Sequence, residues 1–333
     1  MFEKDKKINC DYSDGMGEDK PSVDKTFLAH RVRGRFAPSP TGPLHFGSLI
    51  AALGSFLEAR RQGGEWLVRI EDVDVPRTAP GAADAILRTL ENYGLLWDGR
   101  VIYQSQRTEY YQAALDQLQR AGLAYPCSCT RRDLAGGPRG RDGAPIYSGH
   151  CRNGPRQPGR PCAIRLRLPD VVLTFQDAVQ GEYRQWLASE VGDFVIRRAD
   201  SLFAYQLAVA VDDADQGVTE VIRGSDLLDS TPRQIYLQQV LERPTLRYGH
   251  LPVAVDERGD KLSKQTHAPP LDDRNPGPAL WEALRFLGQS PPTALTHAPP
   301  AEILAWALAH WRLEKVPATL AHPWNTALGR LFQ

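Results

Sequence analysis

The sequence predicts an α/β fold in which crossover helices connect the strands of a parallel sheet. Apolar segments of strand length alternate with segments of helical periodicity through residues 32–126, as in successive βαβ units. Polar residues follow two of the predicted strands, Ser39 after the first and Glu71 after the second. Ligands of such sheets bind beyond the carboxyl ends of the strands, so these side chains predict a binding site there.

The first half of the domain is predicted over residues 31–126. Its first strand covers residues 32–37, and a second buried strand covers residues 66–70. The helix between them is indicated by apolar residues at helical spacing: Leu49, Ile50, Leu53, Phe56 and Leu57. Two further helices are expected at 82–93 and 108–121.

The composition changes at Cys127, where Gly, Pro and Arg become frequent. This change is typical of a loop-rich insertion, and strand-like alternation returns only over residues 163–187. We therefore assign residues 127–190 to an insertion.

Residues 191–265 are predicted to complete the same sheet. An apolar run covers 194–211, a strand is expected at 221–224, and a helix at 231–242 is predicted to be capped by Thr231 and Pro232. Residues 266–333 are expected to form a short tail in which proline-rich spacers separate two helices, at 278–287 and 300–312.

Composition limits the classes of protein that the chain can represent. Its 333 residues are enough for one large core and a smaller unit, and 40 basic residues balance 40 acidic ones. A broadly basic surface is excluded, so RNA would have to bind a local patch. No membrane-length apolar run or signal peptide is visible, which predicts a cytoplasmic protein with reduced cysteines. Residues 1–30 are polar and aperiodic, which predicts a flexible extension.

Two short segments carry side chains suited to binding a phosphate. His45 and Gly47 lie where a strand passes into a helix, and backbone N–H groups at a helix start attract anions. Lys261 and Lys264 lie on a predicted loop, and the chain has no lysine between Lys25 and Lys261. Two lysines in a chain that otherwise uses arginine predict a specific role with phosphate.

A structural zinc site is predicted in the insertion. Cys127, Cys129 and Cys151 could supply three thiolates to a segment that has little apolar core of its own. The spacing leaves the fourth ligand open among Tyr147, His150 and Cys162.

The motifs resemble those of the class I aminoacyl-tRNA synthetases. Residues 45–48 are similar to the HIGH signature, with Phe46 and Ser48 as departures, and residues 261–265 to the KMSKS signature, with Gln265 as a departure. Residues 35–42, 69–74 and 221–227 resemble motifs of the glutamate and glutamine branch and follow in the family's order. The resemblance implies a Rossmann-like catalytic domain.

The resemblance also implies roles for individual residues. His45 and Lys264 would be catalytic, and ATP, which brings Mg²⁺ as part of the substrate, would bind at Pro38, His45, Gly47, Ser48, Lys261 and Lys264. Glutamate would bind at Arg35, Phe36, Ala37, Pro38, Ser39, Glu71, Tyr205 and Arg223. Two arginines favour glutamate over glutamine, because a guanidinium pairs best with a carboxylate. The alternative for Arg35 and Glu71 is ordinary ion pairing at surface strand ends.

The segment after Gln265 is too short for an anticodon-binding domain. In this respect the chain resembles the glutamyl-Q tRNA(Asp) synthetase family, in which a tyrosine completes the metal site, as Tyr147 would here. The resemblance implies activation of L-glutamate and its transfer to queuosine in the anticodon stem-loop of tRNA(Asp), by a monomer with one structural Zn²⁺. The alternatives are a compact glutamyl-tRNA synthetase that charges a tRNA 3′ end and a non-catalytic RNA-binding relative.

Three other groups of residues each allow two interpretations. Asp212, Asp213 and Asp215 suggest either a magnesium site or, as we favour, a structural role. The tail tryptophans have the spacing of a core face rather than of a base-stacking platform: Trp281, Trp306 and Trp311. An arginine cluster could contact an RNA backbone or form a solvated loop: Arg131, Arg132, Arg139, Arg141, Arg152, Arg156 and Arg160.

Overall fold

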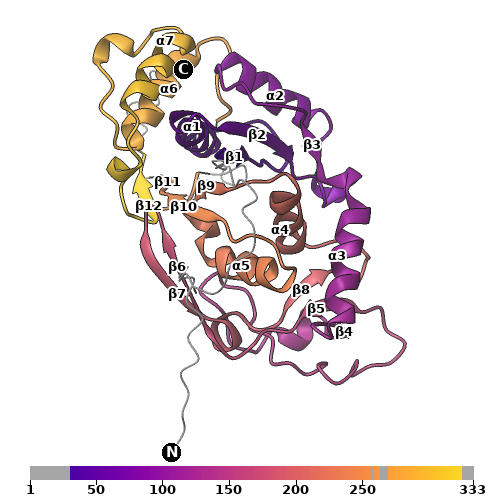
Figure 1. The fold of residues 1–333 in the computed structure, drawn as a ribbon. Coiled ribbons are helices and arrows are strands. Elements are labelled where there is room, and N and C mark those ends of the chain that lie inside the picture. The colour runs from indigo at the N-terminus through magenta and orange to yellow at the C-terminus, as the bar shows by residue number, and fades with distance from the viewer. Residues whose placement is uncertain (1–30, 257, 263–268, 325–333) are drawn as a thin grey trace, which may run out of the picture.

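The computed structural model describes residues 31–256, 258–262 and 269–324 (Figure 1); the expected extension at 1–30 lies outside them. Its strands are β1 (Arg33–Phe36), β2 (Glu65–Ile70), β3 (Ile102–Tyr103), β4 (Ala124–Cys127), β5 (Ala163–Leu166), β6 (Val172–Asp177), β7 (Gly181–Trp186), β8 (Phe194–Arg197), β9 (Glu220–Gly224), β10 (Arg247–Leu251), β11 (Val253–Val255) and β12 (Ala321–Pro323). Its helices are α1 (Phe46–Arg61), α2 (Ala82–Asn92), α3 (Thr108–Arg120), α4 (Tyr205–Asp215), α5 (Thr231–Val240), α6 (Pro276–Phe286) and α7 (Pro300–His310). Each helix predicted from periodicity is confirmed, with ends close to those expected.

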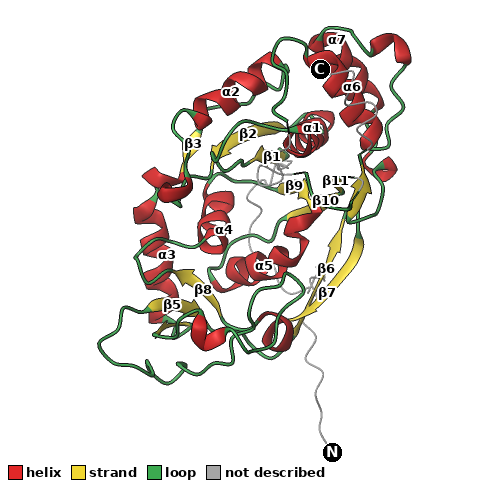
Figure 2. Ribbon diagram, turned by 180° about the vertical axis from the view of Figure 1, so that it is seen from behind, coloured by secondary structure: helices red, strands yellow, loops and turns green. Residues whose placement is uncertain are grey.

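The predicted parallel sheet is built from two ladders that meet at β1 and β9. One ladder has the order β1-β2-β3, all parallel, and the other has the order β7-β6-β10-β9, in which only β7 is antiparallel. The Thr219 N–H, just before β9, donates to the Arg33 carbonyl at 2.9 Å, and the Arg33 N–H donates to the Thr219 hydroxyl at 2.9 Å. Both views place β1 beside β9 (Figures 1 and 2).

Helices cover both faces of this sheet, as the fold class requires. On one face, which we call the first core, α1, α2, α6 and α7 pack against the sheet and bury Leu53 and Trp66. On the other face, the second core, α3, α4 and α5 bury Leu207 and Ile235. Neighbouring residues of β9 pack into opposite cores, Val221 into the second and Ile222 into the first, because successive side chains of a strand point to opposite faces of the sheet. No helix in the described ranges is long and apolar enough to cross a bilayer.

The strands are not divided between the sheets at residues 190 and 191, the predicted boundary between the insertion and the second half of the main sheet. β8 was expected in the second half of the main sheet, but it pairs antiparallel with β5 in the separate sheet β4-β5-β8. In turn β6, within the expected insertion, joins the main sheet through the parallel pair Asp177 and Tyr248. The apolar run at 194–211 is likewise divided, since it contains β8 and the first part of α4. Apolar periodicity predicts a strand but does not predict which other strand it pairs with.

The described residues from 269 onward pack onto the first core. α6 and α7 lie against α1, and Trp311 is fully buried there, as the spacing of the tryptophans predicted, whereas Trp281 and Trp306 are half-buried against the same core. β12 adds to β11 in a parallel pair at Val253–Ala321. Trp324, directly after β12, stacks on Phe46 at the start of α1 with ring centroids 4.7 Å apart.

Trp311→Ala should lower the free energy of unfolding by about 3–5 kcal/mol, since the ring fills the first core and its N–H donates to Glu58 at 2.7 Å. Urea denaturation monitored by circular dichroism measures this. Leu320→Ala is the control, because Leu320 is 57% exposed and its loss should change stability by less than about 0.5 kcal/mol. A loss no larger than the control's would contradict the placement of Trp311 in the core.

Candidate active site

A cavity of about 660 Å³ lies where the carboxyl ends of β1, β2 and β9 meet the first turn of α1. This is the position expected for the ligand of a parallel sheet, and the volume suits a small-molecule site. The cavity brings together these predicted residues: Arg35, Phe36, Ala37, Pro38, Ser39, His45, Gly47, Ser48, Glu71, Tyr205, Arg223 and Lys261. Of the predicted ATP and glutamate residues, Lys264 lies outside the described residues.

The two segments predicted to bind phosphate approach each other at Gly47. A Cβ at this position would lie 3.2 Å from the His45 imidazole and 3.2 Å from the Leu262 carbonyl oxygen. A side chain here would therefore be crowded by the imidazole and by the distant loop. The backbone before α1 is extended at His45, and the imidazole lines the cavity.

Lys261 projects from the loop onto the turn that follows β9. Its ammonium lies 2.5 Å from Asp226, in a pair whose side chains are 45% and 37% exposed. Solvent screens such a pair, so its contribution to stability is small. Lys261 and Asp226 both line the cavity, so this ion pair lies at the edge of the site.

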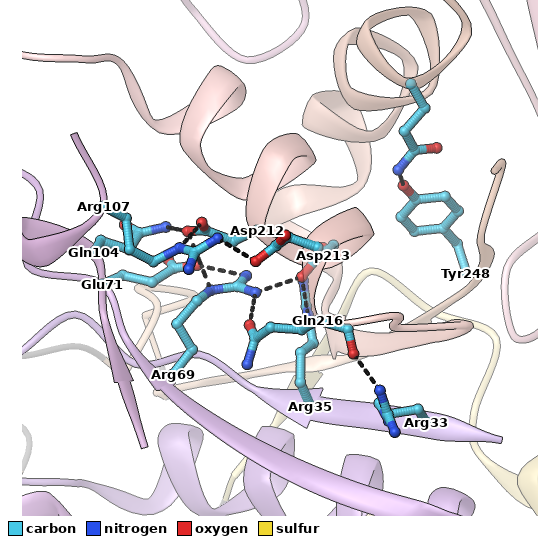
Figure 3. A network of polar contacts seen from close by, with 12 residues as sticks. Arg33, Arg35, Arg69, Glu71, Gln104, Arg107, Asp212, Asp213, Gln216 and Tyr248 are labelled. Carbon is cyan, nitrogen blue, oxygen red and sulfur yellow. Dashed lines mark hydrogen bonds and ion pairs between the residues drawn. The ribbon is translucent and has the colours of Figure 1, made fainter. Parts of the chain in front are cut away.

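The predicted alternative of surface ion pairs is wrong for Arg35 and Glu71, because both side chains are buried. Arg35 is 3% exposed and makes two hydrogen bonds to Asp213 of α4, through Nε at 3.2 Å and Nη2 at 3.3 Å. Glu71 accepts a hydrogen bond from Arg69 at 3.2 Å, and Arg69 also donates to Asp213 at 2.7 Å (Figure 3). Asp213 thus ties β1 and β2 to α4.

The pKa values of Asp213 and Glu71, the two carboxyl groups of this network, are shifted in opposite directions. Burial raises the pKa of Asp213, but the neighbouring charges of Arg35 and Arg69 outweigh it and hold the pKa below its usual value. For Glu71 burial prevails, so its pKa is raised despite Arg69 and Arg35. Burial and the proximity of Glu71 also raise the pKa of Tyr205, at the first turn of α4, to about 12.

The other acidic residues of α4 have structural partners, as we favoured over the magnesium interpretation. Asp212 is fully buried and accepts hydrogen bonds from Gln104, Arg107 and Tyr111, while Arg107 also pairs with Asp215 at 2.6 Å (Figure 3). Asp212 and Asp215 thus both pair with Arg107, which supports the structural interpretation.

Arg223, at the end of β9, is held by three groups of the protein. Its Nε donates to His250 Nε2 at 3.1 Å, and its Nη2 donates to the Thr231 hydroxyl at 2.8 Å and to the Leu227 carbonyl at 3.4 Å. The buried Nη1 has no hydrogen-bond partner within the described ranges. Thr231, predicted to cap α5, makes no capping bond and instead holds this arginine.

The cysteine cluster has the geometry of a metal site. The sulfurs of Cys127, Cys129 and Cys151 all lie within 4.8 Å of one another, and Cys129 and Cys151 are 3.6 Å apart. Thiolates on a tetrahedral zinc are separated by roughly 3.8 Å, so the spacing fits. Although burial opposes it, hydrogen bonds from the Tyr147 hydroxyl and from two backbone N–H groups lower the pKa of Cys151 to about 6.

Tyr147 is the candidate fourth ligand that faces the sulfurs. Its hydroxyl oxygen lies 3.3 Å from Cys127 Sγ and 3.7 Å from Cys129 Sγ. His150 is exposed and bonds to Ser148, and Cys162 contacts the Arg160 carbonyl, so neither belongs to the cluster. The guanidinium of Arg165 lies 4.0 Å from the Tyr147 ring centroid, while burial and hydrogen bonds with the three cysteines raise the pKa of the Tyr147 hydroxyl.

The model of the class I tRNA synthetases for glutamate and glutamine (E and Q), catalytic domain, matches residues 31–278. A glutamyl-Q tRNA(Asp) synthetase of Thiobacillus denitrificans is 57% identical over 290 residues, which are 87% of this chain and 95% of the relative. The chain belongs to the glutamyl-Q tRNA(Asp) synthetase family. Another glutamyl-Q tRNA(Asp) synthetase, from Ectopseudomonas mendocina, is 56% identical over 85% of this chain and 94% of its own length. The predicted family is therefore confirmed, and the chain is a class I synthetase-type ligase.

Solved structures confirm the class I fold. Glutamate-tRNA synthetase from Elizabethkingia anophelis superposes with a TM-score of 0.73 at 23% identity, over 91% of this chain and 70% of its own. A glutamate tRNA ligase from Elizabethkingia meningosepticum superposes with a TM-score of 0.72 at 23% identity, over 91% of this chain and 68% of its own.

Several residues around this synthetase-like cavity were not identified as site residues from the sequence. Asp213 was assigned only a general structural role, and Asp177 and His250, which lie behind Arg223, were not considered. A histidine within the apolar strand β10 was the available signal, since a buried imidazole needs partners.

Asp213→Asn should lower the free energy of unfolding by about 3–5 kcal/mol at pH 7, since the buried guanidinium groups of Arg35 and Arg69 lose the negative charge with which both pair. The folded-state pKa of Asp213 is depressed, so its contribution is complete above the unfolded value of about 3.9 and is lost as pH falls through the folded pKa. The difference between wild type and variant should therefore shrink below about pH 4. Urea denaturation at several pH values tests both expectations.

Asp215→Asn is the matched control on the same helix. Its carboxylate is 44% exposed and also pairs with an arginine, so its loss should cost less than about 1 kcal/mol. Equal effects of the two substitutions would contradict the central role of Asp213.

Proposed function

We propose that the chain activates L-glutamate with ATP to glutamyl-adenylate and transfers the glutamyl group to queuosine in the anticodon of tRNA(Asp). The observation that carries the proposal is the shared cavity, in which the His45 segment, Lys261 and the buried side chains Arg35, Glu71 and Arg223 meet. The relatives above 50% identity are named glutamyl-Q tRNA(Asp) synthetases, which supports the same acceptor.

The nucleotide would occupy the α1 side of the cavity, with Mg²⁺ entering as part of the ATP substrate. Pro38, Gly47 and Ser48 would line its path, and His45 and the lysines would contact the phosphates. The glutamate α-carboxylate attacks the α-phosphate and pyrophosphate leaves, so negative charge moves onto the departing oxygens. Donors fixed before the reaction stabilise that charge, and we assign this catalytic role to His45 and Lys264.

Glutamate would occupy the side of the cavity formed by β1, β2 and α4. Glu71 supplies a carboxylate for the ammonium group, and the unpartnered Nη1 of Arg223 suits a carboxylate. Asp213 contacts the Nε and Nη2 edge of Arg35, which leaves its other edge for the second carboxylate. These contacts are supplemented by the remaining predicted residues: Phe36, Ala37, Pro38, Ser39 and Tyr205.

The zinc site would be structural. Cys127, Cys129, Cys151 and Tyr147 would hold the ion, which would tether the loop between β4 and β5 where apolar packing is sparse. We place this site in a zinc-containing insertion, and we assign residues 266–333 to a short helical tail. The tRNA(Asp) anticodon stem-loop would reach the cavity in which the glutamyl group is activated, and a monomer would suffice, since every assigned residue comes from one chain.

The first experiment compares acceptors. The protein should catalyse ATP–pyrophosphate exchange with L-glutamate in the absence of RNA, and should transfer ¹⁴C-glutamate to tRNA(Asp) that contains queuosine. tRNA(Asp) with guanine at that position is the matched control and should accept none. Transfer to the 3′ end of tRNA(Glu) alone would instead establish a compact glutamyl-tRNA synthetase, and the absence of exchange would favour a non-catalytic relative.

The zinc proposal is tested by metal analysis of the purified protein. Wild type should contain about one zinc per chain, and Cys151→Ser should lose most of it, since a thiolate of the cluster is removed. Cys162→Ser is the control and should retain the wild-type content, because Cys162 lies apart from the cluster. Unchanged zinc in Cys151→Ser would contradict the ligand set.

A further inference from the structure

A chain of buried polar groups lies behind Arg223 and connects three adjacent strands. His250 is a register partner of Arg223 across β10 and β9, and its Nε2 accepts the Arg223 Nε–H at 3.1 Å. On its other side, His250 Nδ1 lies 2.5 Å from Oδ2 of Asp177, at the end of β6. Asp177 and His250 are 2% exposed and fully buried, and neither lines the cavity.

The Asp177 carboxylate determines which imidazole nitrogen carries the proton. Its Oδ1 already accepts the backbone N–H groups of Val179, Gln180 and His250, at 2.9–3.0 Å. Although burial raises the pKa of Asp177, these bonds and His250 outweigh it and lower the pKa, so Oδ2 acts as an ionised acceptor. An ionised acceptor requires the proton on His250 Nδ1.

The imidazole must also be neutral to hold Arg223. Burial and the charge of Arg223 lower the pKa of His250 more than Asp177 raises it. With the proton on Nδ1, Nε2 keeps a lone pair for the Arg223 Nε–H. A proton on Nε2 would instead place two donors against each other at 3.1 Å.

We propose that Asp177 and His250 are positioning residues that fix the orientation of Arg223 toward a carboxylate of the amino acid substrate. Two anchors define the guanidinium plane: His250 at Nε, and Thr231 at Nη2. Nη1, buried and without a partner among the described residues, is the donor left for the ligand of the cavity that Arg223 lines. The inference rests on the proposed function, since it assumes that glutamate binds there.

Asp177→Asn tests the proton argument with little change in shape. The amide oxygen can keep the three backbone hydrogen bonds, while the amide NH₂ donates to His250 Nδ1 and drives the proton to Nε2. The KM for glutamate in ATP–pyrophosphate exchange should rise roughly 10- to 100-fold, as expected when a hydrogen bond to a charged group is lost. The KM for ATP should stay within about twofold, because the nucleotide side of the cavity is untouched.

The decisive comparison repeats the substitution in the His250→Gln background. Glutamine at 250 can still accept from Arg223 through its amide oxygen, but it has no tautomer for residue 177 to select. Asp177→Asn should therefore raise the glutamate KM less than about twofold over His250→Gln alone. An equal rise in both backgrounds, or equal rises for glutamate and ATP, would assign Asp177 a merely structural role and overturn the proposal.

Asp193→Asn is the matched control. Asp193 is also a buried carboxylate that pairs with an arginine, Arg152, but it lies outside the cavity. It should lower stability without a selective change in the glutamate KM. If Asp193→Asn raises that KM as Asp177→Asn does, general destabilisation explains both and the inference fails.

¹⁵N NMR of the imidazoles gives a readout that does not depend on activity. The His250 signal, identified by its loss in His250→Gln, should show a protonated Nδ1 in wild type and a protonated Nε2 in Asp177→Asn. An unchanged tautomer would overturn the positioning argument. Absence of exchange in wild type, together with the expected tautomers, would instead place the failure in the proposed function.

Discussion

The contact between Asp213 and two buried arginines is the constraint on which the cavity depends. Arg35 on β1 and Arg69 on β2 carry positive charges into the interior, where they require carboxylates close by. Asp213 supplies one near the end of α4, the helix whose first residue, Tyr205, lines the cavity. One carboxylate thus fixes the position of an arginine that lines the cavity and the packing of a helix against two strands.

Local features of the sequence predicted most of the fold and the residues of the cavity. Helical periodicity located α1, and short apolar runs located β1, β2 and β9. Ser39 and Glu71 could then be assigned to one site, because parallel strands end at the same edge of a sheet, and the family resemblance added Arg35 and Arg223. Each of these inferences uses residues close together in the chain, a rule that applies to every sheet of this kind, or the motifs of the family.

The features that were missed depend on partners far apart in the chain. Arg35 and Asp213 are separated by 178 positions, and no spacing rule connects them. The exchange of β6 and β8 between sheets has the same origin, because alternation does not specify which strand is the neighbour. Phe46, a departure from the family signature, packs against Phe286 and Trp324, which both lie far along the chain.

The pairing of β12 with β11 affects how the protein folds during its synthesis. Domains fold during synthesis from the N-terminus onward, and both Phe46 and the strand that leads to Lys261 emerge well before residues 321–324. Until residues 321–324 are available, the first turn of α1 lacks its stacked ring and β11 lacks its parallel partner. Segments that line the cavity beside these elements, at Gly47 and at Val253, therefore receive this packing late in synthesis.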